Sequence, residues 1–213
     1  RACGFICCWR SFTCSVRCIA SSRSRDVPES HFGKAVSGVL IVDRYSAYKA
    51  MRQVKLRQLL LAFCWAHVRR DFVRVGKGFP ELKDWALTWL LRTRELYCLN
   101  RERLRHAPGS SERTAAESAL RQHVATMAAQ RDSELAVEKL RTPCRKVLES
   151  LTEHWDGLTL FVNDPRIPME NNYGERLIRG ASRWPQELLW ERSGMVGPHG
   201  HDAVLDLCDI VTS

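Results

Sequence analysis

Two acidic residues far apart in the sequence have surroundings that could present a carboxylate for chemistry. Asp43 follows an apolar, mostly β-branched run at 38–42, which predicts a buried strand carrying the acid to the carboxyl edge of a sheet. Glu175 lies three residues after Asn172, a spacing that predicts a helix with Asn172 as N-cap and Glu175 in a capping box. For Glu175, a capping role and a functional role are both open.

A basic helix is predicted between these two acids. The apolar run 59–64 predicts a second buried strand, and its last residue opens the block Cys-Trp-Ala-His-x-Arg-Arg-x-Phe. A helix is predicted from Trp65 to about Val75. Its basic face could contact nucleic-acid phosphates, which gives salt-dependent affinity, or could be an ordinary solvated surface. The basic residues of this face are Arg69, Arg70 and Arg74.

Three further side chains belong to the candidate set. His67, within the predicted basic helix, could organise a site, orient a phosphate, or be a hydrogen-bonded core residue. Arg176 and Arg179 are three residues apart, so they share one face of the helix that is predicted to contain Glu175.

Three blocks of the sequence together resemble transposases of the insertion-sequence-66 family. They are the strand-borne Asp43, the Cys-Trp-Ala-His-x-Arg-Arg-x-Phe block, and Asn-Asn-x-x-Glu-Arg at 171–176. The resemblance covers 21–180 and implies a DDE transposase with an α/β fold: a partial ribonuclease-H-like core with a helical insertion, predominantly helical overall. Asp43 matches the second acid of the catalytic triad and Glu175 the third. The family usually has Asp-Asn-Asn where this chain has Glu170 and two asparagines, a mild departure.

The resemblance also implies an activity, which is DNA cleavage and strand transfer in insertion-sequence transposition by a two-metal mechanism. Asp43 and Glu175 would be catalytic and would hold Mg²⁺, which prefers oxygen ligands. Insertion-sequence ends would be the DNA partner, an intact relative would be a homo-oligomer, and the location would be the bacterial cytoplasm, at the nucleoid when DNA is bound. The DNA-binding candidates are Arg69, Arg70, Arg176 and Arg179, and the other candidates are His67, Asn171 and Asn172.

The first acid of the triad has no match in this sequence. No Asp or Glu precedes Asp26, and the family does not place its first acid in the connector where Asp26 lies. We therefore expect the chain to be inactive in strand transfer. Absence of the opening strands of the core would also expose a sheet edge.

Composition favours an acidic partner and gives no sign of a membrane span. The 213 residues carry a formal net charge of +9 with a pI of about 9.3, and nucleic acid is the commonest partner of basic proteins. No stretch approaches the roughly 18 consecutive apolar residues of a spanning helix, and the start is not typical of a signal peptide.

The cysteines do not suggest a metal site. Five of the nine lie in the first 18 residues, the others are far apart, and no paired C-x-x-C spacing occurs, which argues against zinc. Three of the dispersed cysteines are expected to be buried reduced thiols, namely Cys64, Cys98 and Cys144.

The sequence suggests five segments. Residues 1–19 are expected to be out of frame or disordered, 20–78 part of the core, 79–155 a helical insertion, 156–180 the core helix with the catalytic Glu, and 181–213 an out-of-frame tail. Within these segments, the pattern predicts one short helix from Tyr48 to about Lys55 and helices starting near Glu81 and Glu112. It also predicts a helical piece that Pro143 kinks or ends, and a helix from about Cys144 to Trp155.

The tail has two open explanations. One choice of codons for residues 183–196 can be read in a shifted frame as G-R-K-N-Y-Y-G-S-G-Q-V-W, which resembles what the family has after Gly180. The hypothesis is therefore a frame change near Ala181, with the His199/His201 pair an accident; the alternative is a genuine divergent tail.

Two other functions stay open beside the transposase. The first is a small basic nucleic-acid-binding protein without catalysis, whose DNA binding would be unchanged by loss of Asp43 or Glu175. The second is a helical interaction module built on 79–155, whose partner binding would be insensitive to salt.

Overall fold

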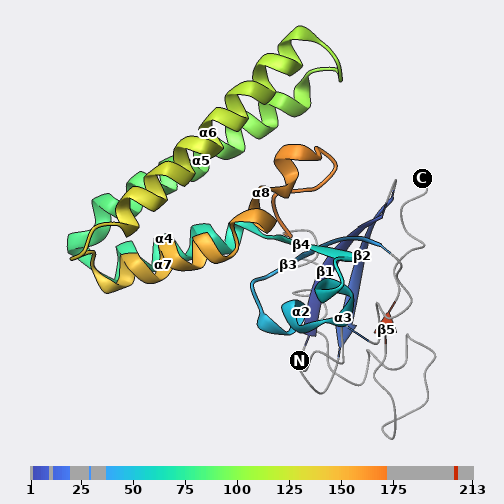
Figure 1. Ribbon diagram of the computed structural model, residues 1–213, viewed down its shortest axis with the longest axis horizontal. Coiled ribbons are helices and arrows are strands. Elements are labelled where there is room, and N and C mark those ends of the chain that lie inside the picture. The colour runs from blue at the N-terminus through green and yellow to red at the C-terminus, as the bar shows by residue number, and fades with distance from the viewer. Residues whose placement is uncertain (1, 10–11, 20–28, 30–36, 172–203, 206–213) are drawn as a thin grey trace, which may run out of the picture. The chain divides into compact units, whose positions relative to one another are not determined.

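The computed structural model describes residues 2–9, 12–19, 29, 37–171 and 204–205. They fall into two compact units, one drawn from Arg1–Cys64 and Ile167–Ser213, the other formed by Trp65–Arg166. The first contains the described strands and the second the long helices (Figure 1), so the described residues are predominantly helical, as expected. The five sequence segments proposed above stay predictions; the compact units divide at other positions.

The first unit is built on a mixed β-sheet. Its strands are β1 (Ala2–Trp9), β2 (Phe12–Ile19), β3 (Gly38–Val42), β4 (Leu59–Phe63) and β5 (Val204–Leu205), in the order β4-β3-β1-β2-β5. Strands β3 and β4 are parallel, with Gly38 opposite Leu59 and Val42 opposite Phe63. The other neighbours are antiparallel. Both strands predicted from apolar runs are confirmed.

The hairpin of β1 and β2 was not predicted from the sequence. Strand β1 pairs with β3, with Ile6 opposite Ile41, so the strand that precedes Asp43 has a neighbour on each side. Strand β3 is therefore an inner strand of the described sheet, and the exposed edge expected from missing opening strands does not lie at β3. The reading frame of 1–19 and the ribonuclease-H-like character of the sheet stay predictions.

The connection from β3 to β4 contains two short helices instead of the single predicted one. They are α2 (Ser46–Ala50) and α3 (Arg52–Lys55). Met51 separates them because its ψ of 140° is not helical. The side chain of Met51 is fully buried, as are those of Leu40 and Ile41 in β3, and each such apolar burial contributes roughly 1.5–3 kcal/mol. These buried side chains hold β3 in place, and Asp43 is the first residue after its end.

The second unit is an all-helical assembly. Its elements are α4 (Trp65–Gly78), the 3₁₀ turn η1 (Pro80–Leu82), α5 (Lys83–Arg105), α6 (Ser111–Leu135), α7 (Thr142–Glu153) and α8 (Trp155–Asn163). Helices α5 and α6 form a long antiparallel hairpin, and α4 runs beside α7 (Figure 1). Ser110 caps α6, since its Oγ accepts from the Arg113 N–H at 3.1 Å. Gly109 before it has a φ of 84°, a conformation that favours glycine.

Helix boundaries differ from the prediction at three places. Helix α4 continues to Gly78 instead of ending near Val75. Pro143 neither kinks nor ends a helix, because it lies in the first turn of α7, where its missing N–H has no helical partner to lose. Beyond α7, His154 has φ −107° and ψ 5°, which separates α8 as a helix that the sequence did not distinguish.

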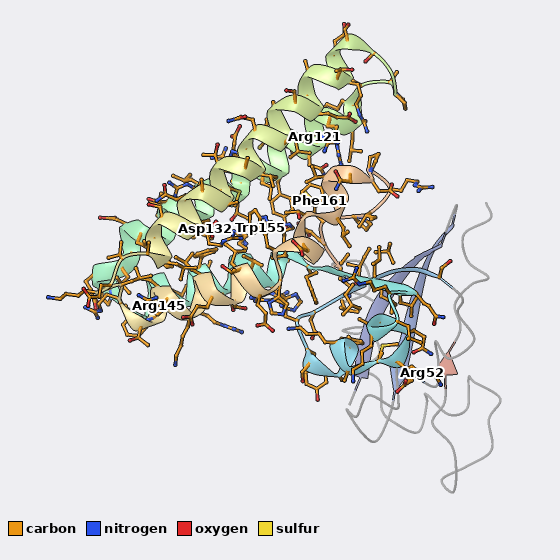
Figure 2. All side chains as sticks on the ribbon, in the orientation of Figure 1. Arg52, Arg121, Asp132, Arg145, Trp155 and Phe161 are labelled. Carbon is orange, nitrogen blue, oxygen red and sulfur yellow. The ribbon has the colours of Figure 1, made fainter. Side chains whose placement is uncertain are left out.

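Arginine side chains bind the carbonyl groups at several helix ends of this unit. Arg103 donates to the carbonyls of Phe161 and Val162 in the last turn of α8, at 2.8 and 2.9 Å. Arg145 donates to Val137 O at 2.8 Å, just beyond α6. Near the same end of α8, Arg121 donates to Asn163 Oδ1 at 2.9 Å (Figure 2). A cation at a helix C-terminus satisfies carbonyls that lack intrahelical partners and complements the helix dipole.

Two properties of the described residues bear on the sequence predictions. None of their helices has both the length and the apolarity that crossing a lipid bilayer requires. Among the described cysteines, Cys64, Cys98 and Cys144 are free thiols. Cys64 and Cys144 are buried as predicted, whereas Cys98 is half-buried.

Candidate functional site

Asp43 lies where the sequence predicted it, immediately after β3 at the carboxyl end of the parallel strand pair. The residue is exposed. One carboxylate oxygen, Oδ1, accepts a hydrogen bond from the Tyr45 N–H at 3.1 Å, which is the local turn that Asp side chains commonly form. A carboxylate has further acceptor capacity on both oxygens, so this turn fixes the side chain without using all of its lone pairs.

Cys64 occupies the corresponding position after β4. Its N–H donates to Val42 O at 3.2 Å, which extends the parallel ladder by one bond and joins Cys64 to the residue just before Asp43. Its side chain is fully buried. Because the carboxyl ends of parallel neighbours meet at one edge of a sheet, Asp43 and Cys64 belong to the same edge.

The segment at 167–171 returns to this edge from the end of the helical unit. Ile167, Met169 and Asn171 are buried, and the intervening Pro168 and Glu170 are half-buried. The last of the buried residues makes the specific contact, because the Asn171 N–H donates to Cys64 Sγ at 3.2 Å. The chain is thus attached to the carboxyl edge four residues before Glu175.

Several predicted site residues lie outside the described part of the chain. They are Asn172, Glu175, Arg176 and Arg179, and the proposed frame change near Ala181 falls there too. Asn171 is described: its backbone takes part in the edge contact and its side chain is buried.

The described residues test the expected Mg²⁺ ligands only in part. Asp43 is an exposed carboxylate at a strand end, which is the ligand type that Mg²⁺ takes. Within the described ranges, no group of three or more His, Cys, Asp or Glu side chains could hold a metal. Asp43 therefore fits as one ligand, and a set would need Glu175.

The predicted basic face belongs to α4 in the helical unit. Arg69 and Arg74 are exposed, and Arg74 makes an ion pair with Asp71 at 3.2 Å. Arg70 is half-buried, with its Nη1 3.2 Å from His67 Nε2. His67 is also half-buried. Its contact with Arg70 lies within the same helix, and its role in a functional site stays a prediction.

Sequence reasoning missed the contact between Cys64 and Asn171. The two residues are 107 positions apart. The bond joins a backbone N–H to a thiol, and such a bond produces no periodic pattern in the sequence. The available signal was position alone, since each residue opens a block on which the family resemblance rests.

Comparison with known proteins identifies the family. The model of the family described as "Transposase IS66 family" matches residues 14–184. Among curated proteins of Sinorhizobium fredii, the uncharacterized protein y4jD is 30% identical over 76% of this chain and 32% of its own length, and the uncharacterized protein y4qI is 28% identical over 77% and 30%. The chain thus spans about a third of the length of these curated relatives. No solved structure matches it significantly. The family match covers most of the sequence, and the chain belongs to the IS66 transposase family.

Proposed function

We propose that this chain supplies two of the three acids of a DDE transposase that cleaves and joins DNA in insertion-sequence transposition. Asp43 and Glu175 would hold Mg²⁺. When bound between carboxylates, Mg²⁺ stabilises charge that develops on a phosphodiester and activates a hydroxyl or water nucleophile. Insertion-sequence ends as the DNA partner, a multimeric assembly and a place at the nucleoid belong to this proposal. We expect metal binding and DNA binding from the chain.

One observation supports the proposal above the others, namely the bond from the Asn171 N–H to Cys64 Sγ. Cys64 is joined through its own N–H to the residue that precedes Asp43. An extended chain advances at most about 3.6 Å per residue, so the Cα of Glu175 lies within roughly 14 Å of the Cα of Asn171. Asn171 is thereby held at the edge that carries Asp43, and Glu175 follows it by four residues in the sequence.

The first test measures metal binding by the whole chain. Asp43→Asn and Glu175→Gln are each expected to weaken Mn²⁺ binding at least tenfold, because an amide is a poorer ligand than a carboxylate for a hard cation. Free Mn²⁺ is followed by electron paramagnetic resonance, with Mg²⁺ as competitor. Asp71→Asn, on α4, is the matched control and should bind like the wild type. Wild-type affinity in both site variants would contradict the proposal.

A second candidate function, nucleic-acid binding without catalysis, is favoured by the exposed cations of α4. Arg69, Arg74 and Lys77 are exposed on a 14-residue helix with a single acid, Asp71. Such a face suits the phosphate backbone and carries no sequence information by itself.

The α4 cations should make DNA affinity steeply dependent on salt. Replacing Arg69 and Arg74 together by alanine is expected to reduce the slope of log K against log salt by about 1.8, since each lost phosphate contact removes about 0.9. Fluorescence anisotropy with a labelled duplex across salt concentrations measures the slope. Arg105→Ala, an exposed arginine on α5 paired with Glu102 at 2.9 Å, should leave it unchanged. An unaltered slope in the double variant would place the DNA contact elsewhere.

The metal-binding and DNA-binding measurements together separate the two functions. If Asp43→Asn and Glu175→Gln leave metal affinity intact while the α4 double variant loses DNA affinity, the non-catalytic function is the better account. If the carboxylate variants bind metal more weakly than the wild type, the proposed transposase site is supported.

A further inference from the structure

We infer that Cys64 is a positioning residue, whose buried thiol holds the chain leading to Glu175 beside the strand end that carries Asp43. The inference rests on the proposed function, because it concerns how the two proposed ligands are kept together. Cys64 would touch neither metal nor DNA. Its role would lie entirely in the geometry of the carboxyl edge.

Cys64 is bonded to both parts of the proposed site at once. Through its N–H it is attached to Val42 O at 3.2 Å, one residue before Asp43. Through Sγ it accepts from the Asn171 N–H at 3.2 Å, four residues before Glu175. Cys64 therefore joins the end of β3 to the segment 167–171 through one backbone bond and one side-chain bond, and a substitution of its side chain removes only the second.

The thiol supplies the directional part of the attachment. Ile167 and Met169 of the same segment are buried, but apolar contacts are non-directional and do not fix a backbone along its length. The Asn171 residue is 2% exposed, so its N–H has little access to water, and a buried N–H needs an acceptor. Sulfur is a weak acceptor, and Cys64 Sγ accepts from this N–H at 3.2 Å.

Substitutions at Cys64 separate this role from general packing. Cys64→Ala removes the acceptor, Cys64→Val removes it while still filling the space, and Cys64→Ser replaces it by a hydroxyl oxygen. Cys144→Ala is the matched control, because Cys144 is also a buried free thiol but lies in α7 of the helical unit. The Cys64→Val variant carries the comparison if Cys64→Ala does not fold.

Two readouts on the whole chain test the inference. Cys64→Ala and Cys64→Val are expected to weaken Mn²⁺ binding at least tenfold and to speed hydrogen exchange of the Asn171 amide at least tenfold. Cys64→Ser should return both values to within about threefold of the wild type, and Cys144→Ala should change neither. Circular dichroism at the measuring temperature confirms that each variant is folded.

The outcomes distinguish this inference from the proposed function. Wild-type Mn²⁺ affinity in Cys64→Ala and Cys64→Val, with affinity still lost in Asp43→Asn, overturns the positioning role and leaves the proposed function standing. Failure of Cys64→Ser to restore affinity also overturns it, because packing and not hydrogen bonding would then be decisive. A wild-type chain that binds no Mn²⁺ contradicts the proposed function, and the positioning role falls with it.

Discussion

Replacing Trp89 by alanine is expected to lower the free energy of unfolding of the helical unit by about 3–5 kcal/mol. The indole is fully buried. It stacks on Phe72 with ring centroids 5.3 Å apart, and its Nε1–H donates to Glu134 Oε2 at 3.1 Å. Removing the ring would lose the buried apolar area, leave a cavity between α4 and α5, and break one of the two indole bonds to that carboxylate.

Urea denaturation followed by circular dichroism measures the effect of Trp89→Ala. The matched control is Leu91→Ala, two residues further along α5, whose side chain is 52% exposed and which should change stability by less than about 0.5 kcal/mol. A loss below about 1 kcal/mol in Trp89→Ala would contradict the packing described for this unit. Trp85 shares the same acceptor, with its Nε1–H 2.7 Å from Glu134 Oε2, so some of the polar interaction would persist.

Arg103→Met is the second large effect, with an expected loss of about 3 kcal/mol in the free energy of unfolding. The Arg103 residue is 1% exposed, and its guanidinium donates to Phe161 O, Val162 O and Asn100 Oδ1 at 2.7–2.9 Å. Methionine fills much of the space but donates nothing, so the two carbonyls would stay buried without this partner. An unsatisfied buried polar group costs about 1–3 kcal/mol, and backbone carbonyls cannot be removed by mutation.

The charge of Arg103 does not alter this expectation. Burial lowers the pKa of its guanidinium from the ordinary value, and the nearby Arg113 lowers it further, yet an arginine remains charged in proteins near neutral pH. Arg105→Met is the control on the same helix, since that side chain is 64% exposed and paired only at the surface. Equal thermal midpoints for Arg103→Met and Arg105→Met would show that the bonds from Arg103 to the last turn of α8 contribute nothing to stability.

Much of the framework could be predicted because it follows from local pattern. The apolar run before Asp43 and the run ending at Cys64 became β3 and β4, since a short continuous apolar run is typical of a strand in a sheet core. The helical periodicity from Glu81 onward became α5. Pro143 was misjudged because a helix-breaking residue and a helix-starting one look alike in sequence; only the surrounding turn decides.

What the sequence did not reveal depends on tertiary contact. Strand β2 alternates apolar and polar residues from Phe12 to Cys18, but β1 does not, and the partner of β1 beyond the hairpin is β3, more than twenty residues away. Arg103 lies three residues after Asn100 on the buried face of α5, a register where an arginine is unusual. That position hinted at a bonded core cation, but its acceptors are 58 and 59 residues distant.

Cys64 and Trp65 are consecutive residues, and each binds the chain on its return. The Trp65 Nε1–H donates to Leu158 O at 2.8 Å, 93 residues on, and Cys64 Sγ accepts from Asn171, 107 residues on. Residues 65–166 thus begin at a hydrogen bond within the helical unit and are flanked by one within the sheet unit. Because the entropy of closing a loop grows only with the logarithm of its length, we expect that the α5–α6 hairpin could be lengthened or trimmed at its tip at little cost to either bond. A change in the length of this hairpin is then expected to leave the carboxyl edge of the sheet unaltered.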